Sequence, residues 1–193
     1  MQSGKKTPAD LGGKAIALET KLSEMMDVRQ LERPAAAGET EVKLDARVGE
    51  LTLEHLLGMA SNLDWRERYE GDLAKSSIVR MLWLDGAKDM SGLAASVKFG
   101  EGGPGKKFIY SSGNAVIAMR AMQNVYGAEY DNMPWSVLFD QIGVEKGNVA
   151  FERDVKGVYV GSSYVHTTLN DMAKFGYTYL NGGSPARLVR RFH

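Results

Sequence analysis

The sequence predicts a mostly α-helical protein, and three observations support this prediction. Apolar residues recur at helical spacing in several separate stretches, serine or threonine stands where most of these stretches begin, and few segments alternate as strands do. About five or six helices with few strands are typical of a mostly α domain or of the helical half of an α+β protein. We expect a single domain over residues 1–193.

Three helices are predicted in the first half of the chain. Residues 14–31 place apolar side chains at helical spacing with charged ones between them, which predicts a surface helix. At 51–60, Thr52 can cap a short helix whose apolar residues fall at i, i+3, i+4 and i+7. The third helix spans residues 76–84, before an Asp-Gly pair breaks the pattern.

A junction between extended and helical chain is predicted at Tyr110. The glycine-rich cluster at 100–105 indicates a turn, and residues 106–110 are typical of a short extended segment. From Ser111 to about residue 126 the apolar residues repeat at helical spacing, behind side chains that can cap the helix. Tyr110 is therefore expected directly before a helix.

The last part of the chain predicts two more helices. Pro134 fits the first turn of a short helix that ends near 142–143, and residues 155–161 alternate like a strand or an extended loop. Thr168 opens a sequence that resembles a capping box, with Asp171 in the usual glutamate place. The helix that follows is expected to turn an apolar stripe inward, formed by Met172, Ala173, Gly176, Tyr179 and Leu180.

The composition excludes several classes of protein. Of the 193 residues 44% are hydrophobic, and the 24 basic side chains are balanced by 24 acidic ones. This profile is not typical of disordered or nucleic-acid-coating chains, so we expect no nucleic-acid partner. Without cysteine the chain cannot form a thiolate zinc site or an iron–sulfur cluster, and with three histidines we expect no histidine-rich metal site.

A hydrolytic serine needs a base within hydrogen-bond reach, and only spacing motifs reveal such a pair in a sequence. The esterase motif Gly-x-Ser-x-Gly is absent, and a single Ser-x-x-Lys occurs, from Ser3 to Lys6. One helical turn would bring the Lys6 amine beside the Ser3 hydroxyl. Pro8 disturbs that helix, so a chance match is the preferred interpretation, with Ser3 and Lys6 kept as candidates.

Other polar residues are interpreted as structural. His55 lies within an otherwise apolar helix, and His166 lies in a loop or directly before a helix. The carboxylates Glu67, Glu70 and Asp72 show no spacing that would pair them as a general acid and base.

Three strings of sequence, taken together, resemble a known family. They are LTLEHLLGMASNLDW at 51–65, YSSGNA at 110–115 and YVGSSYVHTTLNDMAKFGYTYLNGG at 159–183. In order and approximate spacing they are similar to the serine β-lactamase-related hydrolases, the group of class C β-lactamases, esterases and D,D-peptidases, and most closely to the branch of 6-aminohexanoate-dimer hydrolases. The similar region covers about residues 50–183, and residues 1–49 and 184–193 match poorly.

The resemblance implies a site built around Tyr110. In that family a Ser-x-x-Lys pair, a tyrosine in a Tyr-x-Asn or Tyr-x-Ser motif and a late Lys-Thr-Gly or His-x-Gly strand act together without metal or cofactor. Tyr110 matches the tyrosine, with Ser112 at the third position, and would relay a proton between serine, lysine and leaving group. Residues 184–193 match nothing in the late motif.

The resemblance therefore implies the helical middle of an α+β β-lactamase-like (transpeptidase-like) fold, truncated or rewritten at both ends and lacking much of its antiparallel sheet. The implied function is that of a serine hydrolase, which cleaves a small-molecule amide or ester through an acyl-serine intermediate. The alternative is a non-catalytic relative that remains as a binding or structural remnant. A homo-oligomer could cover the apolar surface that an incomplete fold exposes.

No apolar run approaches the roughly 20 residues needed to span a bilayer, and no secretory signal follows Met1. As written, the sequence predicts a soluble, cytoplasmic protein without a membrane partner, and the original compartment is left open.

Overall fold

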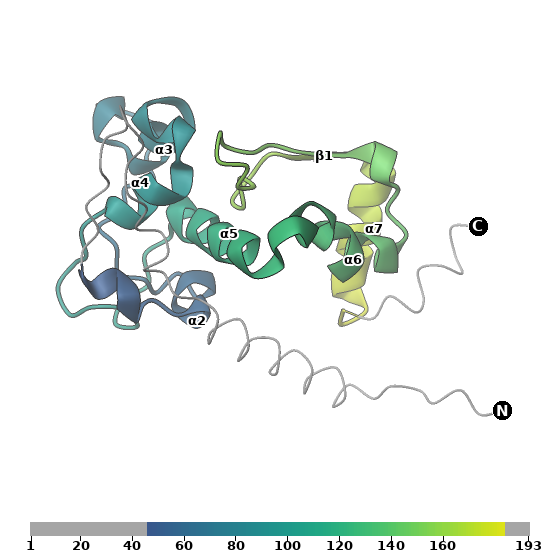
Figure 1. Cartoon of the computed structure of the whole chain (residues 1–193), viewed down its shortest axis with the longest axis horizontal. Helices are drawn as coiled ribbons and strands as arrows, with labels where there is room; N and C mark the ends of the chain where they lie inside the picture. Colours follow the sequence, from purple (N-terminus) through teal and green to yellow (C-terminus); the bar gives the residue numbers. More distant parts are fainter. Residues whose placement is uncertain (1–45, 184–193) are drawn as a thin grey trace.

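The computed structural model describes residues 46–183, and these residues form a mostly helical body with one small antiparallel sheet (Figure 1). The α-helices are α2 (Leu53–Leu57), α3 (Ser77–Trp83), α4 (Met90–Ser96), α5 (Ser112–Tyr126), α6 (Met133–Val137) and α7 (Leu169–Leu180). The sheet pairs β1 (Val149–Phe151) with β2 (Val165–Thr167). Single turns of 3-10 helix occupy Ala46–Glu50, Leu73–Lys75, Asp85–Lys88, Gly127–Asn132, Phe139–Ile142 and Lys146–Asn148.

Side-chain caps begin α2, α3, α5 and α7, and those at Thr52, Ser111 and Thr168 were predicted. Thr52 accepts a hydrogen bond from the main-chain N–H of His55, and the His55 ring accepts one from the N–H of Thr52, which completes a capping box. Ser76, Ser111 and Thr168 cap α3, α5 and α7 in the same way, each through an N–H three residues on. The helix expected at residues 14–31 lies outside the described residues.

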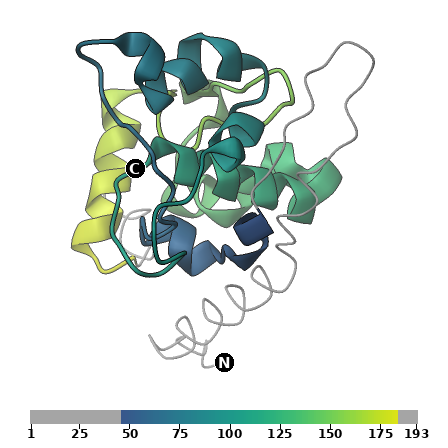
Figure 2. The ribbon, with the colours of Figure 1, turned by 90° about the vertical axis from the view of Figure 1, so that its left-hand side faces the viewer.

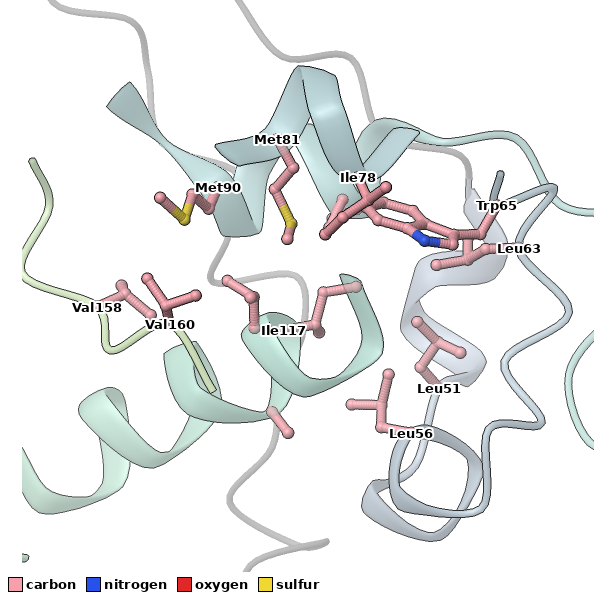
Figure 3. Close-up of a cluster of buried hydrophobic side chains, with 14 of the residues drawn as sticks. Leu51, Leu56, Leu63, Trp65, Ile78, Met81, Met90, Ile117, Val158 and Val160 are labelled. Atoms are coloured by element: carbon pink, nitrogen blue, oxygen red, sulfur yellow. The ribbon is translucent and has the colours of Figure 1, made fainter. Parts of the chain in front are cut away.

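The main hydrophobic core is built around α5. Its buried residues Val116, Ile117 and Ala118 lie among side chains from α2, α3 and α4, as Figure 3 shows for several of them. Val158 and Val160, from the loop between β1 and β2, pack on the same core. Segments that are far apart in the sequence thus meet on one central helix.

A second, aromatic cluster joins α6, α7 and the sheet. Trp135 is its buried centre, and Phe139 and Phe151 contact the Trp135 ring at centroid distances of 5.3 and 6.4 Å. Phe175 from α7 packs against the same group. Figure 1 shows α5 leading from the α2–α4 group toward α6 and α7, while the β1–β2 hairpin runs back above α5.

Two local expectations were wrong. Helix α4 was not predicted, because its sequence MSGLAAS has small residues in place of a clear apolar period. The short helix expected from Pro134 to 142–143 is broken at Leu138, after which a 3-10 turn begins. Residues 106–110 belong to no helix and to no strand. The strands β1 and β2 flank the 155–161 segment that was expected to be extended.

The orientation of α7 also differs from the prediction. The apolar stripe of Met172, Ala173, Gly176, Tyr179 and Leu180 is exposed, and Asp171 and Thr178 are buried instead. The reason is a set of polar contacts beneath the helix: the Lys174 ammonium donates to the Gly143 carbonyl at 2.6 Å and to Asp171 at 2.8 Å, and Asn148 also donates to Asp171. These contacts fix the rotation of α7 about its axis.

Among residues 46–183, no helix combines the length and apolar character that crossing a membrane requires.

Candidate functional site

Tyr110 lies where the chain enters α5, as predicted. The residue before it is anchored by a hydrogen bond from the Ile109 N–H to the Met59 carbonyl at 2.8 Å, and the residue after it is Ser111, the buried cap of α5. Both neighbours of Tyr110 are therefore held, while its own side chain is 57% exposed. The phenol is thus accessible to a small molecule from solvent.

Ser112 does not present a free hydroxyl. Its Oγ donates to Glu67 Oε1 at 2.6 Å, and its main-chain N–H donates to Glu67 Oε2 at 3.0 Å. The indole N–H of Trp65 donates to the same carboxylate. A carboxylate beside the first turn of a helix is favoured by the helix dipole and by the unpaired N–H groups there. The Ser112 hydroxyl is thus hydrogen-bonded to Glu67 in this structure, and its role in the site stays a prediction.

Tyr69 extends the site on its solvent side. Its hydroxyl donates to Glu67 Oε1 at 3.4 Å, and its ring meets Trp83 edge-on at 6.5 Å. Desolvation raises the pKa of Tyr69 above its usual value, and the Glu67 carboxylate and then Tyr110 and Tyr164 raise it further. Tyr69 therefore remains protonated at neutral pH and acts as a donor toward Glu67.

The first and second of the similar strings meet directly. The Ser61 hydroxyl donates to Asn114 Oδ1 at 2.8 Å, and both side chains are buried. Asn62 has φ of +59°, a conformation that asparagine tolerates, and its amide donates to the Glu101 and Gly103 carbonyls at 2.8 and 3.0 Å. These contacts hold the glycine-rich turn that leads toward Tyr110.

The third string reaches α5 at Ala115 and Met119. Gly161 lies so close to α5 that a Cβ there would stand 2.8 Å from the Ala115 carbonyl oxygen and would overlap Met119. Tyr164 follows at φ of +61° and packs against the main core. All three strings therefore converge on the first half of α5, and Tyr110 lies immediately before it.

The two histidines in the described residues have local partners. His55 was expected to be buried and hydrogen-bonded; it is hydrogen-bonded, in the capping box of α2, but only half-buried. His166 Nε2 lies 3.1 Å from Glu152 Oε1, on the exposed side of the hairpin. Its acidic neighbour was missed, because Glu152 is distant in sequence and is brought close only by the β1–β2 pairing.

Within residues 46–183, no group of three or more histidine, aspartate or glutamate side chains is placed to hold a metal ion. Ser3 and Lys6, the candidates for nucleophile and base, lie outside the described residues. The described part of the site thus consists of an exposed phenol, Tyr110, and, at Ser112 two residues further on, a carboxylate, Glu67, that the side chains of Ser112, Trp65 and Tyr69 hold in place.

Glu67 and Tyr69 are the site residues that sequence reasoning missed. The one available signal was the spacing Trp65-x-Glu67-x-Tyr69, which in an extended segment places all three side chains on one side. The partner of Glu67 on α5 is 45 residues away, and no local pattern indicates it.

No model of a known protein family matches the chain, and no curated protein matches it significantly.

Proposed function

We propose that this chain is the helical part of a serine hydrolase of the β-lactamase-related family, in which Tyr110 is the acid–base residue for cleavage of an amide or ester bond. The observation that carries the proposal is the convergence of the three similar strings on the first half of α5, with the exposed Tyr110 phenol at that point. The helical middle of a β-lactamase-like α+β fold is the architecture proposed with it.

The surroundings of Tyr110 are compatible with proton transfer. A phenol can donate a proton to a leaving group and can take one from an attacking hydroxyl, provided that its oxygen reaches the reacting atoms. The main chain on either side of Tyr110 is anchored by the Ile109–Met59 hydrogen bond and by the Ser111 cap. A catalytic group must be held in position, and anchored main chain on both sides provides that support.

Tyr110 cannot supply the covalent step alone, because an acyl intermediate needs a nucleophile with a base beside it. The Ser112 hydroxyl is committed to Glu67 at 2.6 Å, so we assign Ser112 to the support of α5. Ser3 and Lys6 form the single Ser-x-x-Lys pair of the sequence and are kept as the candidate nucleophile and base, and the proposed substrate is a small molecule with an amide or ester bond. No metal or cofactor enters the proposed reaction.

Labelling with a fluorophosphonate, read by intact mass, tests the proposal. Wild type should gain one adduct, Ser3→Ala should gain none, and Tyr110→Phe should react at least about 100-fold more slowly. Tyr179→Phe is the matched control, because Tyr179 is 75% exposed on α7 and is not part of the Tyr110 site, and its rate should stay within about twofold of wild type. Equal rates in Tyr110→Phe and Tyr179→Phe would refute the role of Tyr110.

A second candidate is a non-catalytic relative that binds a small ligand through the same surface. It is favoured by the engagement of Ser112 with Glu67 and by the exposed aromatic side chains near α5, which include Tyr69, Trp83 and Tyr110. If wild type gains no fluorophosphonate adduct, saturable quenching of Trp83 fluorescence by an aromatic amide would support the non-catalytic binding function. Tyr110→Ala should weaken that quenching. Quenching that is the same in Tyr110→Ala and in wild type would exclude binding at this site.

A further inference from the structure

We propose that the exposed apolar face of α7 is an interface between two copies of this chain. The face, called the α7 seam here, consists of Leu169, Met172, Gly176, Tyr179 and Leu180. The four large side chains are 91, 53, 75 and 84% exposed in that order. Figure 2 shows α7 along one edge of the molecule. The inference stands independently of the proposed hydrolase function.

The spacing of the α7 seam suits packing against another helix. Leu169, Met172, Gly176 and Tyr179 are separated by three, four and three residues, the spacing by which apolar side chains form one seam between paired helices. Gly176 lies at the centre of the face, and no heavy atom stands within 4 Å of the position that a Cβ would take. Two seams can therefore approach closely at this glycine.

The charges of α7 favour a second copy as the occupant. Its only charged side chains are Asp171 and Lys174, which pair with each other at 2.8 Å. Both are largely buried on the face opposite the α7 seam, with side-chain exposures of 1 and 12%. The seam itself is uncharged, so an identical seam meets no repulsion, whereas a charged partner would find nothing to pair with.

The available area fits a weak dimer. At roughly 150 Å² for a fully exposed side chain of this size, the four large residues offer on the order of 450 Å² per copy. A standard interface buries about 800 Å² per partner, so the α7 seam supplies more than half of that area. An apolar patch of this extent on a water-facing helix is otherwise typical of an interaction site. Because this area is below that of a standard interface, we expect a dimer that forms only at high protein concentration.

Sedimentation velocity on the full chain, from about 1 to 200 µM, is the first test. The protein should shift from monomer to dimer, and Met172→Glu should raise the dissociation constant at least about tenfold, because it places a charge in an apolar contact. Asn170→Glu is the matched control: it adds the same charge at an exposed position of α7 outside the seam and should leave the dimer intact.

The absence of cysteine from the chain allows a second test. Gly176→Cys should form a disulfide-linked dimer under mild oxidation, whereas Asn170→Cys should not, since only the former lies on the α7 seam. Circular dichroism should show that all four variants keep their helical content. A monomer at every concentration, a dimer that Met172→Glu leaves unchanged, or equal cross-linking of both cysteine variants would overturn the proposal.

Discussion

Glu67 and Ser112 form a two-point contact between an irregular segment and the first turn of α5. One carboxylate oxygen of Glu67 accepts the Ser112 hydroxyl hydrogen at 2.6 Å, and the other accepts the Ser112 main-chain N–H at 3.0 Å. The N–H groups of a first helical turn lack partners within the helix, so this carboxylate satisfies a donor that would otherwise need water. Glu67 thus acts as a cap that comes from a distant part of the chain.

The first prediction is that Glu67→Gln destabilises the protein by about 1–2 kcal/mol. The amide of the glutamine has one acceptor oxygen, whereas the Glu67 carboxylate has two. Ser112 or Trp65 therefore loses a charge-assisted hydrogen bond. Urea denaturation followed by far-UV circular dichroism measures the change. Glu70→Gln, at an exposed position nearby, is the control and should cost less than about 0.5 kcal/mol. Equal effects of the two variants would show that the carboxylate of Glu67 is dispensable.

The second prediction contrasts two glycines that both lie within helices. A Cβ at Gly113 of α5 would stand 2.6 Å from the buried ring of Trp65, whereas a Cβ at Gly176 of α7 would meet nothing within 4 Å. Gly113→Ala should therefore destabilise by about 1–3 kcal/mol through overpacking. Gly176→Ala should stabilise by about 0.5–1 kcal/mol, since alanine is the better helix former.

Thermal unfolding of both glycine variants, at one protein concentration well below the range of dimerisation, compares them directly. A rise in Tm for Gly113→Ala would mean that Trp65 can move aside, and that the close approach of Gly113 to the Trp65 ring is not required for the fold.

The predictable parts of this fold were those that depend on neighbours in sequence. Thr52, Ser76, Ser111 and Thr168 each cap the helix that was expected behind them, because a cap needs only the side chain and an N–H three residues on. The position of Tyr110 directly before α5 followed from the same local signals.

The unpredictable parts depend on contacts across the fold. The rotation of α7 was predicted from its apolar stripe, but Lys174 and Asp171 bury polar groups against Gly143 and Asn148, and those partners are not visible in the pattern of the helix itself. The same is true of the site, where Glu67 is brought to α5 only by the tertiary structure. Ser3 and Lys6 remain predictions, since they lie outside residues 46–183.

The third prediction concerns Asp154, a buried carboxylate that holds two segments together. It accepts hydrogen bonds from the main-chain N–H groups of Met90, Lys156 and Val158 at 2.9–3.1 Å. Asp154→Ala would leave all three donors without this acceptor and should cost about 2–4 kcal/mol.

Asp154→Asn is the informative comparison for this site. Its single amide oxygen can still accept from Lys156 and Val158, so it should cost distinctly less than the alanine variant in the same urea titration. Identical losses in the two variants would show that size and shape at position 154, and not its acceptor oxygens, determine stability.

The fourth prediction is a pH dependence that Asp171 imposes. The Lys174 ammonium, followed by the donors Thr168 and Asn148, holds the pKa of Asp171 below its usual value despite the burial of the carboxylate. A carboxylate with a lowered pKa in the folded state contributes stability that is fully present above its unfolded pKa of about 3.9. That contribution is lost as the pH falls through the lower, folded value.

Asp171→Asn should therefore have a lower free energy of unfolding than wild type at pH 7. The difference should narrow as the pH falls below about 4, because the carboxylate is then protonated in the unfolded chain before it is protonated in the folded one. Unfolding by urea at a series of pH values, followed by tryptophan fluorescence, measures this difference, because Trp135 lies in the cluster that α7 helps to form. Asp140→Asn, at an exposed position of the same region, should show no comparable narrowing. A difference between Asp171→Asn and wild type that stays constant down to pH 2 would mean that Asp171 stabilises α7 through its shape and hydrogen bonds, and that its charge opposite Lys174 contributes nothing.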